Sequence, residues 1–567
     1  MEFKAYLAEK IAGALREAFD ASVDGIPGFL ETPPNPEMGD FAFPCFRLSK
    51  ALRMAPPAIA GKLSERIAPD QVIERVECVG GYLNFFLHKT GYAQSIVERV
   101  LEQGERYGSS DEGQGRVICI DYSSINIAKR FHIGHLSTTM IGNALYKIYE
   151  HLGYKCVGIN HLGDWGTQFG KMIAAYRKWG SPEQVEQGGV NALTELYVRF
   201  HKEAETDPAL EDEGRLWFKK IEDGDPEALR IFNKFKEITL KDAQRVYDML
   251  GVQFDSYAGE SFYNDKMQPV IDELREKGLL KESQGAYVVD LEEEGMPPCL
   301  ILKKDGATLY ATRDLAAAFY RKKTYDFYKD LYVVAYQQDL HFRQWFKVVE
   351  KMGYDWSKDL EHVAFGMVSY EGRALSTREG YVVYLDELLT RAVEKAREII
   401  EEKSPNLADK DKVARQVGIG AVVFFDLFNN RIKDIDFRWE RVLNFDGETG
   451  PYVQYTHARC CSVLAKAGEL SAAPDYAALD NAEAQEVVRS LERFPELVRE
   501  ACQRNEPSLL TRFTVELPSN FPRYYYENRI LTEDAAASAA RVNLTAATAS
   551  CLRTALGLIG VEAPEKM

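Results

Sequence analysis

The sequence lacks paired cysteines, long apolar runs and a leader-like start. Its 567 residues include nine scattered cysteines, of which only Cys460 and Cys461 are close together, and no CxxC pair occurs. This pattern argues against a disulfide framework and a thiolate zinc site, so we expect no protein-bound zinc. No run approaches the ~20 apolar residues that cross a bilayer, so we expect no membrane partner. The amphipathic start mixes both charge signs, unlike a secretory or transit signal, and we expect a cytoplasmic protein.

Basic residues are also scarce relative to acidic ones. The chain has 70 Lys and Arg against 87 Asp and Glu, a formal charge of −17. On its own this charge would disfavour a nucleic-acid partner. The excess is local, however, because residues 181–300 hold 27 acidic and 14 basic residues. The charge therefore does not exclude RNA, and we expect RNA to avoid the surface of 181–300 except at local basic clusters.

The first 112 residues are predicted to form a small α/β domain. Apolar residues at spacings of four predict a helix over 2–20, and a second helix is expected over 58–67. The run 76–87 has the composition of a strand and is expected to end the domain. The polar stretch 108–115 is typical of a linker. We therefore place the N-terminal domain at 1–112.

The middle of the chain, 113–395, alternates strands and helices. Strands are expected over 117–120, 155–166 and 331–337, and a helix is expected to begin near Gly134. Strand–loop–helix–strand is the opening of a parallel, nucleotide-binding sheet, in which ligands bind at the C-terminal ends of the strands. The predicted fold class is α/β, with a Rossmann-type catalytic domain that is interrupted by insertions at about 181–300.

A short motif after the first of these strands carries the strongest functional signal. His132 and His135 are three residues apart at the expected helix start, so both rings can project on one side. A helix N-terminus suits polyphosphate, and Gly134 lets a flat base or ribose approach the backbone. Imidazoles can donate hydrogen bonds as charge develops during phosphoryl displacement. A surface pair of histidines and a metal site are the alternatives, although no third metal ligand lies at useful spacing.

The motif HIGH at 132–135 is the signature of class I aminoacyl-tRNA synthetases, and the flanking stretch 121–170 resembles arginyl-tRNA synthetases in particular. Similar stretches follow in the family's order: 39–52 in its N-terminal add-on domain, 257–263, 308–318 and 335–342 in its active site, and 436–459 and 556–567 in its α-helical anticodon-binding domain. The resemblance spans the whole chain and implies an all-α anticodon-binding bundle at 396–567.

The resemblance implies an arginine–tRNA ligase. Such an enzyme activates L-arginine with ATP and Mg²⁺ to arginyl-adenylate, then transfers the arginyl group to the 3′-terminal adenosine of tRNA(Arg). It implies that activation needs bound tRNA, and we expect a monomer. One alternative is a catalytically inactive synthetase-like tRNA-binding protein, which would be expected to have lost HIGH. A cysteinyl-type synthetase is a further alternative, but it would need a zinc site. A small-molecule adenylate-forming ligase is another, but it would have no use for the two ends of the chain that resemble tRNA-contacting domains.

The resemblance also implies which residues bind the arginine substrate. A guanidinium substrate requires carboxylates and planar acceptors. On the residues alone, Asp314 could be a helix N-terminal charge, Glu260 a solvated loop residue and Asp164 part of a structural turn. His341 and Gln337 are further candidates on the expected strand 331–337. The family pattern assigns these residues to the arginine site: Asp121, Ser124, Asn126, His161, Glu260, Tyr310, Asp314 and Gln338.

The family's second signature, KMSKS, is degenerate at 372–380, where alanine and threonine stand in place of its two lysines. A cationic loop normally neutralises the pyrophosphate leaving group. Lys129 is the expected replacement, with Arg373 and Arg378 as further cations. The residues expected at ATP are His132, Gly134, His135, Leu375 and Ser376.

Aromatic residues lie beside arginines in the last part of the chain. Aromatic rings can stack on splayed bases, and arginine contacts phosphate. Tyr455, Arg459, Tyr526 and Arg529 are therefore expected to contact tRNA. Three adjacent tyrosines at 524–526 cannot all face one side of a helix, so at least one is expected in the core.

Overall fold

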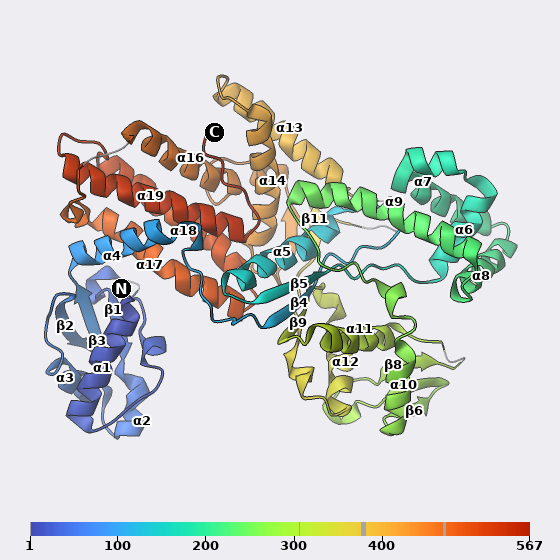
Figure 1. Cartoon of the computed structure of the whole chain (residues 1–567), viewed down its shortest axis with the longest axis horizontal. Helices are drawn as coiled ribbons and strands as arrows, with labels where there is room; N and C mark the ends of the chain where they lie inside the picture. Colours follow the sequence, from blue (N-terminus) through green and yellow to red (C-terminus); the bar gives the residue numbers. More distant parts are fainter. Residues whose placement is uncertain (1, 34, 305–306, 376–380, 469–471) are drawn as a thin grey trace. The chain divides into compact units, whose positions relative to one another are not determined.

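The structure is a computed structural model that describes residues 2–33, 35–304, 307–375, 381–468 and 472–567 (Figure 1). Two compact units make up the chain. The first comprises Met1–Tyr107, Cys460–Arg493 and Glu516–Cys551, and the second Gly108–Arg459, Phe494–Val515 and Leu552–Met567. The C-terminal helices contribute residues to both units, so the domain limits at 112 and 395 remain predictions.

The first unit contains an antiparallel sheet in the order β1-β3-β2. The run 76–87, expected as one strand, is a hairpin that turns at Gly80 and Gly81, both of which have positive φ. Glycine adopts this conformation without the cost that other residues incur, which explains the turn inside an otherwise strand-forming run. The chain then continues into a helix instead of ending the unit. The elements are α1 (Phe3–Phe19), β1 (Phe41–Pro44), α2 (Ser49–Leu52), α3 (Pro56–Ser64), β2 (Ile73–Val79), β3 (Tyr82–Leu87) and α4 (Lys89–Gln103).

A four-stranded parallel sheet lies at the centre of the second unit, with α5 (Leu136–His151) and α11 (Tyr310–Tyr325) packed on it. The strand order β10-β9-β4-β5 places β4 between β5 and β9, so the order reverses at β4. Ligands of such sheets bind beyond the carboxyl ends of the strands at this reversal. The strands are β4 (Val117–Asp121), β5 (Lys155–Ile159), β9 (Lys329–Tyr332) and β10 (Leu360–His362).

Several predicted boundaries were too long. The strand expected over 155–166 ends at Ile159, and the one expected over 331–337 ends at Tyr332. Just past these two strand ends the ladder is replaced by isolated β-bridges, such as those of Gly163 with Asn126 and of Ala335 with Phe365. Gln337 therefore lies in a 3₁₀ turn, and His341 lies in α12 (Asp339–Lys351) and not on a strand.

The acidic insertion supplies helices and a small sheet. Figure 1 shows α6 to α9 grouped together in the second unit. Helix α9 begins where Asp225 accepts a hydrogen bond from the Ala228 amide and ends at Gly251, which has positive φ. The elements of this part of the chain are α6 (Thr167–Trp179), which precedes the insertion, α7 (Pro182–Ala204), α8 (Ala209–Glu222), α9 (Pro226–Leu250), α10 (Met267–Glu276), β6 (Leu280–Ser283), β7 (Ala286–Val289) and β8 (Cys299–Lys303), which extends beyond it.

Helices dominate the rest of the chain, as predicted, but a small sheet in the order β12-β11-β13 also occurs. All nine cysteines lie in the described part of the chain, and none of them forms a disulfide. Among the described helices, none is both long and apolar enough to span a membrane. The remaining elements are β11 (Val368–Tyr370), β12 (Arg373–Ala374), α13 (Leu385–Lys403), α14 (Lys410–Phe428), β13 (Ile435–Phe437), α15 (Trp439–Val442), α16 (Gly450–Ala467), α17 (Ala482–Gln503), α18 (Ser508–Glu527) and α19 (Ala535–Leu558).

Candidate active site

A cavity of about 410 Å³ lies in the second unit. Its lining comes from β4, β9 and the segments that follow β4, β5 and β9, from the turn at Glu260, from one face of α11 and from the start of α12. The segments after the strands meet there because parallel strands end at the same edge of a sheet. Every residue that the sequence assigned to arginine lines this cavity: Asp121, Ser124, Asn126, His161, Glu260, Tyr310, Asp314 and Gln338.

The segment after β4 is a tightly wound loop. Ser123, Ser124 and Ala128 have φ values of 70°, 46° and 63°, which are unfavourable for residues other than glycine. Close packing against the segment after β5 helps to fix the loop. A Cβ on Gly163 would collide with Oδ1 of Asn126, so a larger residue at this position would displace the Asn126 amide.

Asp121 is engaged by the protein itself. Its Oδ2 accepts a hydrogen bond from Nη2 of Arg321 at 2.6 Å, and its Oδ1 accepts one from the Ser124 hydroxyl at 2.8 Å. Arg321 is buried and also faces Asp330, whose Oδ2 lies 3.6 Å from Nη1. Burial raises the pKa of Asp330, while Arg321 opposes this shift. The carboxylate of Asp121 therefore holds Ser124 in place and carries a buried countercharge.

Arg321 lines the cavity but was not predicted. It follows Asp314 and Ala317 at the i, i+3, i+7 spacing of one helix face, so it projects on the side of α11 that lines the cavity. That spacing, in a helix already assigned to the site, was the signal that could have identified Arg321.

Two further carboxylates, those of Glu260 and Asp314, line the cavity and are placed to contact a bound cation. Burial raises the pKa of Glu260 to about 7, and Arg313, 3.9 Å away, partly opposes this shift. Oδ2 of Asp314 lies 2.6 Å from Nε2 of His341, so His341 contributes to the site although it lies on α12. Burial lowers the pKa of His161, which favours its neutral ring. These groups make the cavity suited to a planar cationic head group.

The two histidines of HIGH accept hydrogen bonds from backbone amides of the motif itself. The Gly134 amide donates to Nδ1 of His132 at 3.1 Å, and the His132 amide donates to Nδ1 of His135 at 3.2 Å, with the rings 4.0 Å apart. A neutral imidazole that accepts at Nδ1 carries its proton at Nε2. Burial lowers the pKa of His132, and lowers that of His135 to about 3. Both rings are therefore neutral donors through Nε2 at neutral pH.

The predicted cations are only partly described. Lys129 is exposed in the loop that precedes HIGH. Arg373 is exposed in β12, and its guanidinium lies over the ring of Tyr381 at 4.0 Å. Leu375 is half-buried, whereas Ser376 and Arg378 lie outside the described residues.

The sequence comparisons agree with this geometry. A family model for the catalytic domain of class I (R) tRNA synthetases matches residues 96–439. The arginine–tRNA ligase of Alkaliphilus metalliredigens is 55% identical over 539 residues, which cover 95% of each chain. The chain belongs to the arginyl-tRNA synthetase family. The family's N-terminal domain model matches residues 5–87, and a DALR anticodon-binding domain model matches 453–567.

Other relatives cover the chain equally well. The arginine–tRNA ligase of Clostridioides difficile is 54% identical and covers 98% of this chain and 99% of its own. Among solved structures, the arginyl-tRNA synthetase of Thermus thermophilus has a TM-score of 0.84 at 27% identity and covers 100% of both chains. The structure from Plasmodium falciparum, at 23% identity and a TM-score of 0.81, shows the same fold.

The residues expected to meet tRNA are accessible to different degrees. Tyr526 is 74% exposed and Tyr455 48% exposed. Arg529 is exposed and Arg459 half-buried. Tyr524 is fully buried, as expected for one of three adjacent tyrosines in a helix. Their contacts with RNA remain a prediction for this member of the arginyl-tRNA synthetase family.

Proposed function

We propose that the chain is an arginine–tRNA ligase that makes arginyl-adenylate from L-arginine and ATP and transfers the arginyl group to tRNA(Arg). The observation that carries this proposal is the cavity in which Glu260 and Asp314 can meet a guanidinium. Asn126 and Ser124, on the loop after β4, are suited to the α-amino end of the same ligand. The cavity thus offers groups for both ends of arginine.

Activation requires no nucleophile from the protein. The arginine carboxylate attacks the α-phosphorus of ATP, a new P–O bond forms, and the bond to the bridging oxygen breaks so that pyrophosphate leaves. ATP enters with Mg²⁺. The Nε2–H groups of His132 and His135 donate to phosphate oxygens as charge develops, and Gly134 leaves space for the nucleoside. Leu375 and Ser376 complete the ATP site in this proposal.

Lys129 takes the place of the missing loop lysines in this account, with Arg373 and Arg378 as lesser contributors. Lys129 lies three residues before His132 and is exposed. Lys129→Ala should slow adenylate formation more than Arg373→Ala does. A larger effect of Arg373→Ala would mean that the cation replacing the missing lysines lies in the loop 372–380.

Transfer to the 3′-terminal adenosine requires tRNA contacts outside the cavity. We assign these to the segments similar to the family's N-terminal and anticodon-binding domains, including Tyr455, Arg459, Tyr526 and Arg529. We also propose that the enzyme works as a monomer in the cytoplasm. Sedimentation of the purified protein with and without tRNA tests the oligomeric state.

Charging of tRNA with each of the twenty amino acids tests the function. The proposal predicts charging with arginine alone, and pyrophosphate exchange with arginine only when tRNA(Arg) is present. tRNA binding without any charging would instead support an inactive tRNA-binding protein.

A further inference from the structure

The loop after β4 is held by helix α9 of the acidic insertion. The Ala128 amide donates to Oγ1 of Thr239 at 2.9 Å, and Thr239 is buried. The Thr239 hydroxyl donates its own proton to the Phe235 carbonyl at 2.8 Å, so its oxygen is available as an acceptor. Ala128 has a φ of 63°, an unfavourable conformation that persists only where surrounding contacts impose it. Thr239 supplies one such contact.

A second contact from α9 reaches the start of the same loop. The Tyr247 hydroxyl lies 2.8 Å from Oγ of Ser123 and accepts a hydrogen bond from Nδ2 of Asn160 at 2.8 Å. Oγ of Ser123 also lies 3.0 Å from Oγ1 of Thr139, whose hydroxyl reaches the carbonyl of His135 at 2.7 Å. Buried hydrogen bonds therefore connect α9 to the second histidine of HIGH. Such buried networks fix geometry because each unsatisfied group would be costly.

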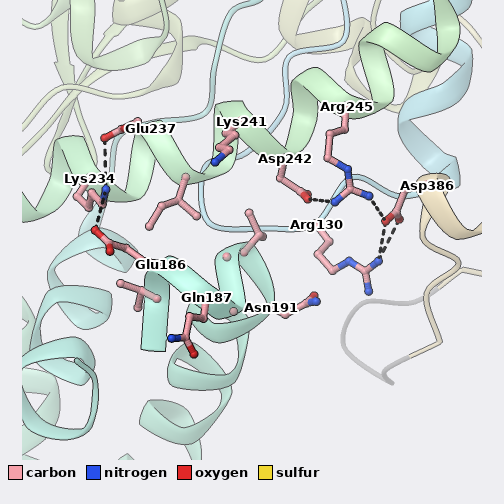
Figure 2. Close-up of a pocket in the computed structure, with 15 residues that line it drawn as sticks. Arg130, Glu186, Gln187, Asn191, Lys234, Glu237, Lys241, Asp242, Arg245 and Asp386 are labelled. Carbon is pink, nitrogen blue, oxygen red and sulfur yellow. Dashed lines mark hydrogen bonds and ion pairs between the residues drawn. The ribbon is translucent and has the colours of Figure 1, made fainter. Parts of the chain in front are cut away.

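Helix α9 also meets the loop through charged side chains, but this contact is weaker. Figure 2 shows Arg130 and Arg245 on Asp386, with Arg130 Nη2 at 3.0 Å and Arg245 Nη2 at 3.6 Å from its carboxylate. These residues line a cavity of about 580 Å³. The Arg245 side chain is 66% exposed, and exposed ion pairs contribute little. The buried hydroxyls of Thr239 and Tyr247 are therefore the stronger constraint.

We propose that Thr239 and Tyr247 are positioning residues for adenylate formation. They hold residues 123–128 in the conformation that presents Ser124 and Asn126 to arginine and that fixes the chain leading into Lys129. Neither is among the residues that line the arginine cavity, so both act through the loop. The inference rests on the proposed function, and it assigns a role in the reaction to an insertion that the sequence analysis singled out only for its acidic charge.

Thr239→Val tests this role, because valine keeps the shape and removes the acceptor. With tRNA(Arg) present, we expect a fall in kcat for arginine charging of about tenfold, as for loss of the partner of a buried amide, together with a higher KM for arginine and an unchanged KM for tRNA. Thr239→Ser should restore activity. Thr194→Val is the matched control, since the Thr194 hydroxyl donates to the Val190 carbonyl of its own helix, at 2.9 Å.

Tyr247→Phe should give the same pattern, with Tyr197→Phe as its control. Tyr197 lies on α7 of the same insertion, outside the loop and the stretches assigned to the active site, and its ring packs against that of His201 with the centroids 4.6 Å apart. Equal activities of Thr239→Val and Thr194→Val, or failure of Thr239→Ser to restore activity, would overturn the proposal.

Hydrogen–deuterium exchange provides a readout that does not require activity. In Thr239→Val, peptides covering 122–131 should exchange faster than in the unmodified protein, while peptides of α9 and α7 keep their rates. Unchanged exchange in 122–131, or faster exchange throughout the insertion, would contradict a positioning role. If the unmodified protein fails to charge tRNA with arginine, the proposed function falls, and exchange still decides whether Thr239 holds the loop.

Discussion

Oδ2 of Asp121 and Nη2 of Arg321 lie 2.6 Å apart in a buried ion pair at the wall of the cavity. Removing one member of a buried pair typically costs about 3 to 5 kcal/mol, and Asp330, 3.6 Å from Arg321, keeps part of the countercharge here, so the loss should lie at the lower end of that range. We therefore expect Asp121→Asn to lower the free energy of unfolding by an amount of this size in urea titrations. Asp314→Asn is the control, because Asp314 is more accessible and pairs with His341. Equal, small losses in both variants would show that the Asp121–Arg321 ion pair does not contribute this much to the free energy of unfolding.

Glu260 should make arginine binding depend on pH. Burial raises its pKa to about 7, and only the ionised carboxylate attracts a guanidinium. The KM for arginine is therefore expected to fall as the pH rises from 6 to 8, by at most about tenfold per pH unit. In Glu260→Gln the KM should be higher and lose this dependence. A wild-type KM that is flat over this range would contradict the role of Glu260.

The histidines of HIGH should act as neutral donors. Their pKa values are lowered by burial, that of His135 to about 3, so neither needs a second proton at neutral pH. At saturating arginine, the rate of adenylate formation should not fall as the pH rises through 6.5. His132→Ala or His135→Ala should lower this rate by ~10²–10³, the effect of losing one charge-stabilising donor. The glutamine variants, which keep an N–H donor, should retain more activity; if alanine and glutamine are equally harmful, the donor role is wrong.

The buried carboxyl group of Asp426 should make the stability of the protein depend on pH. It is buried in α14, its Oδ1 accepts a hydrogen bond from Ser137 at 2.6 Å, and burial raises its pKa to about 7. Because the folded pKa lies above the unfolded value, folding favours the protonated acid, and stability is lost as the pH rises from about 4 to about 7. Asp426→Asn should therefore be more stable than the unmodified protein at pH 8.

The comparison should be made by denaturant unfolding at several pH values. The advantage of Asp426→Asn is expected to shrink toward zero near pH 4, with a slope of at most about 1.4 kcal/mol per pH unit. A pH-independent difference between the two proteins would show that Asp426 does not titrate on folding in this range.

The resemblance to arginyl-tRNA synthetases supplied the residues assigned to arginine, and these residues line one cavity, although their contacts with arginine stay a prediction. Asp121, Asn126 and His161 lie at or after the ends of parallel strands, where ligands of such sheets bind. The strand ends were less predictable. Apolar residues continue past Tyr332, but the ladder does not, since pairing depends on neighbouring segments.

The spacing on α11 could have placed Arg321 at the cavity, but the partners of the groups that support the site could not be found from local pattern. Arg321 pairs with Asp121 across 200 residues, and Thr239 reaches Ala128 across 111 residues. A buried threonine or tyrosine in an amphipathic helix has the same local pattern whether or not its hydroxyl reaches a distant loop. Only the packing of α9 on the loop distinguishes these cases.

Charging with arginine and with citrulline tests the central claim most directly. Citrulline has nearly the same shape but replaces the cationic guanidinium with a neutral urea, which would place an oxygen against acidic acceptors. A site built on Glu260 and Asp314 should prefer arginine by about 10⁴ or more in kcat/KM, and Glu260→Gln should reduce that ratio. Comparable charging with both amino acids, or a ratio that Glu260→Gln leaves unchanged, would contradict the assignment of this cavity to arginine.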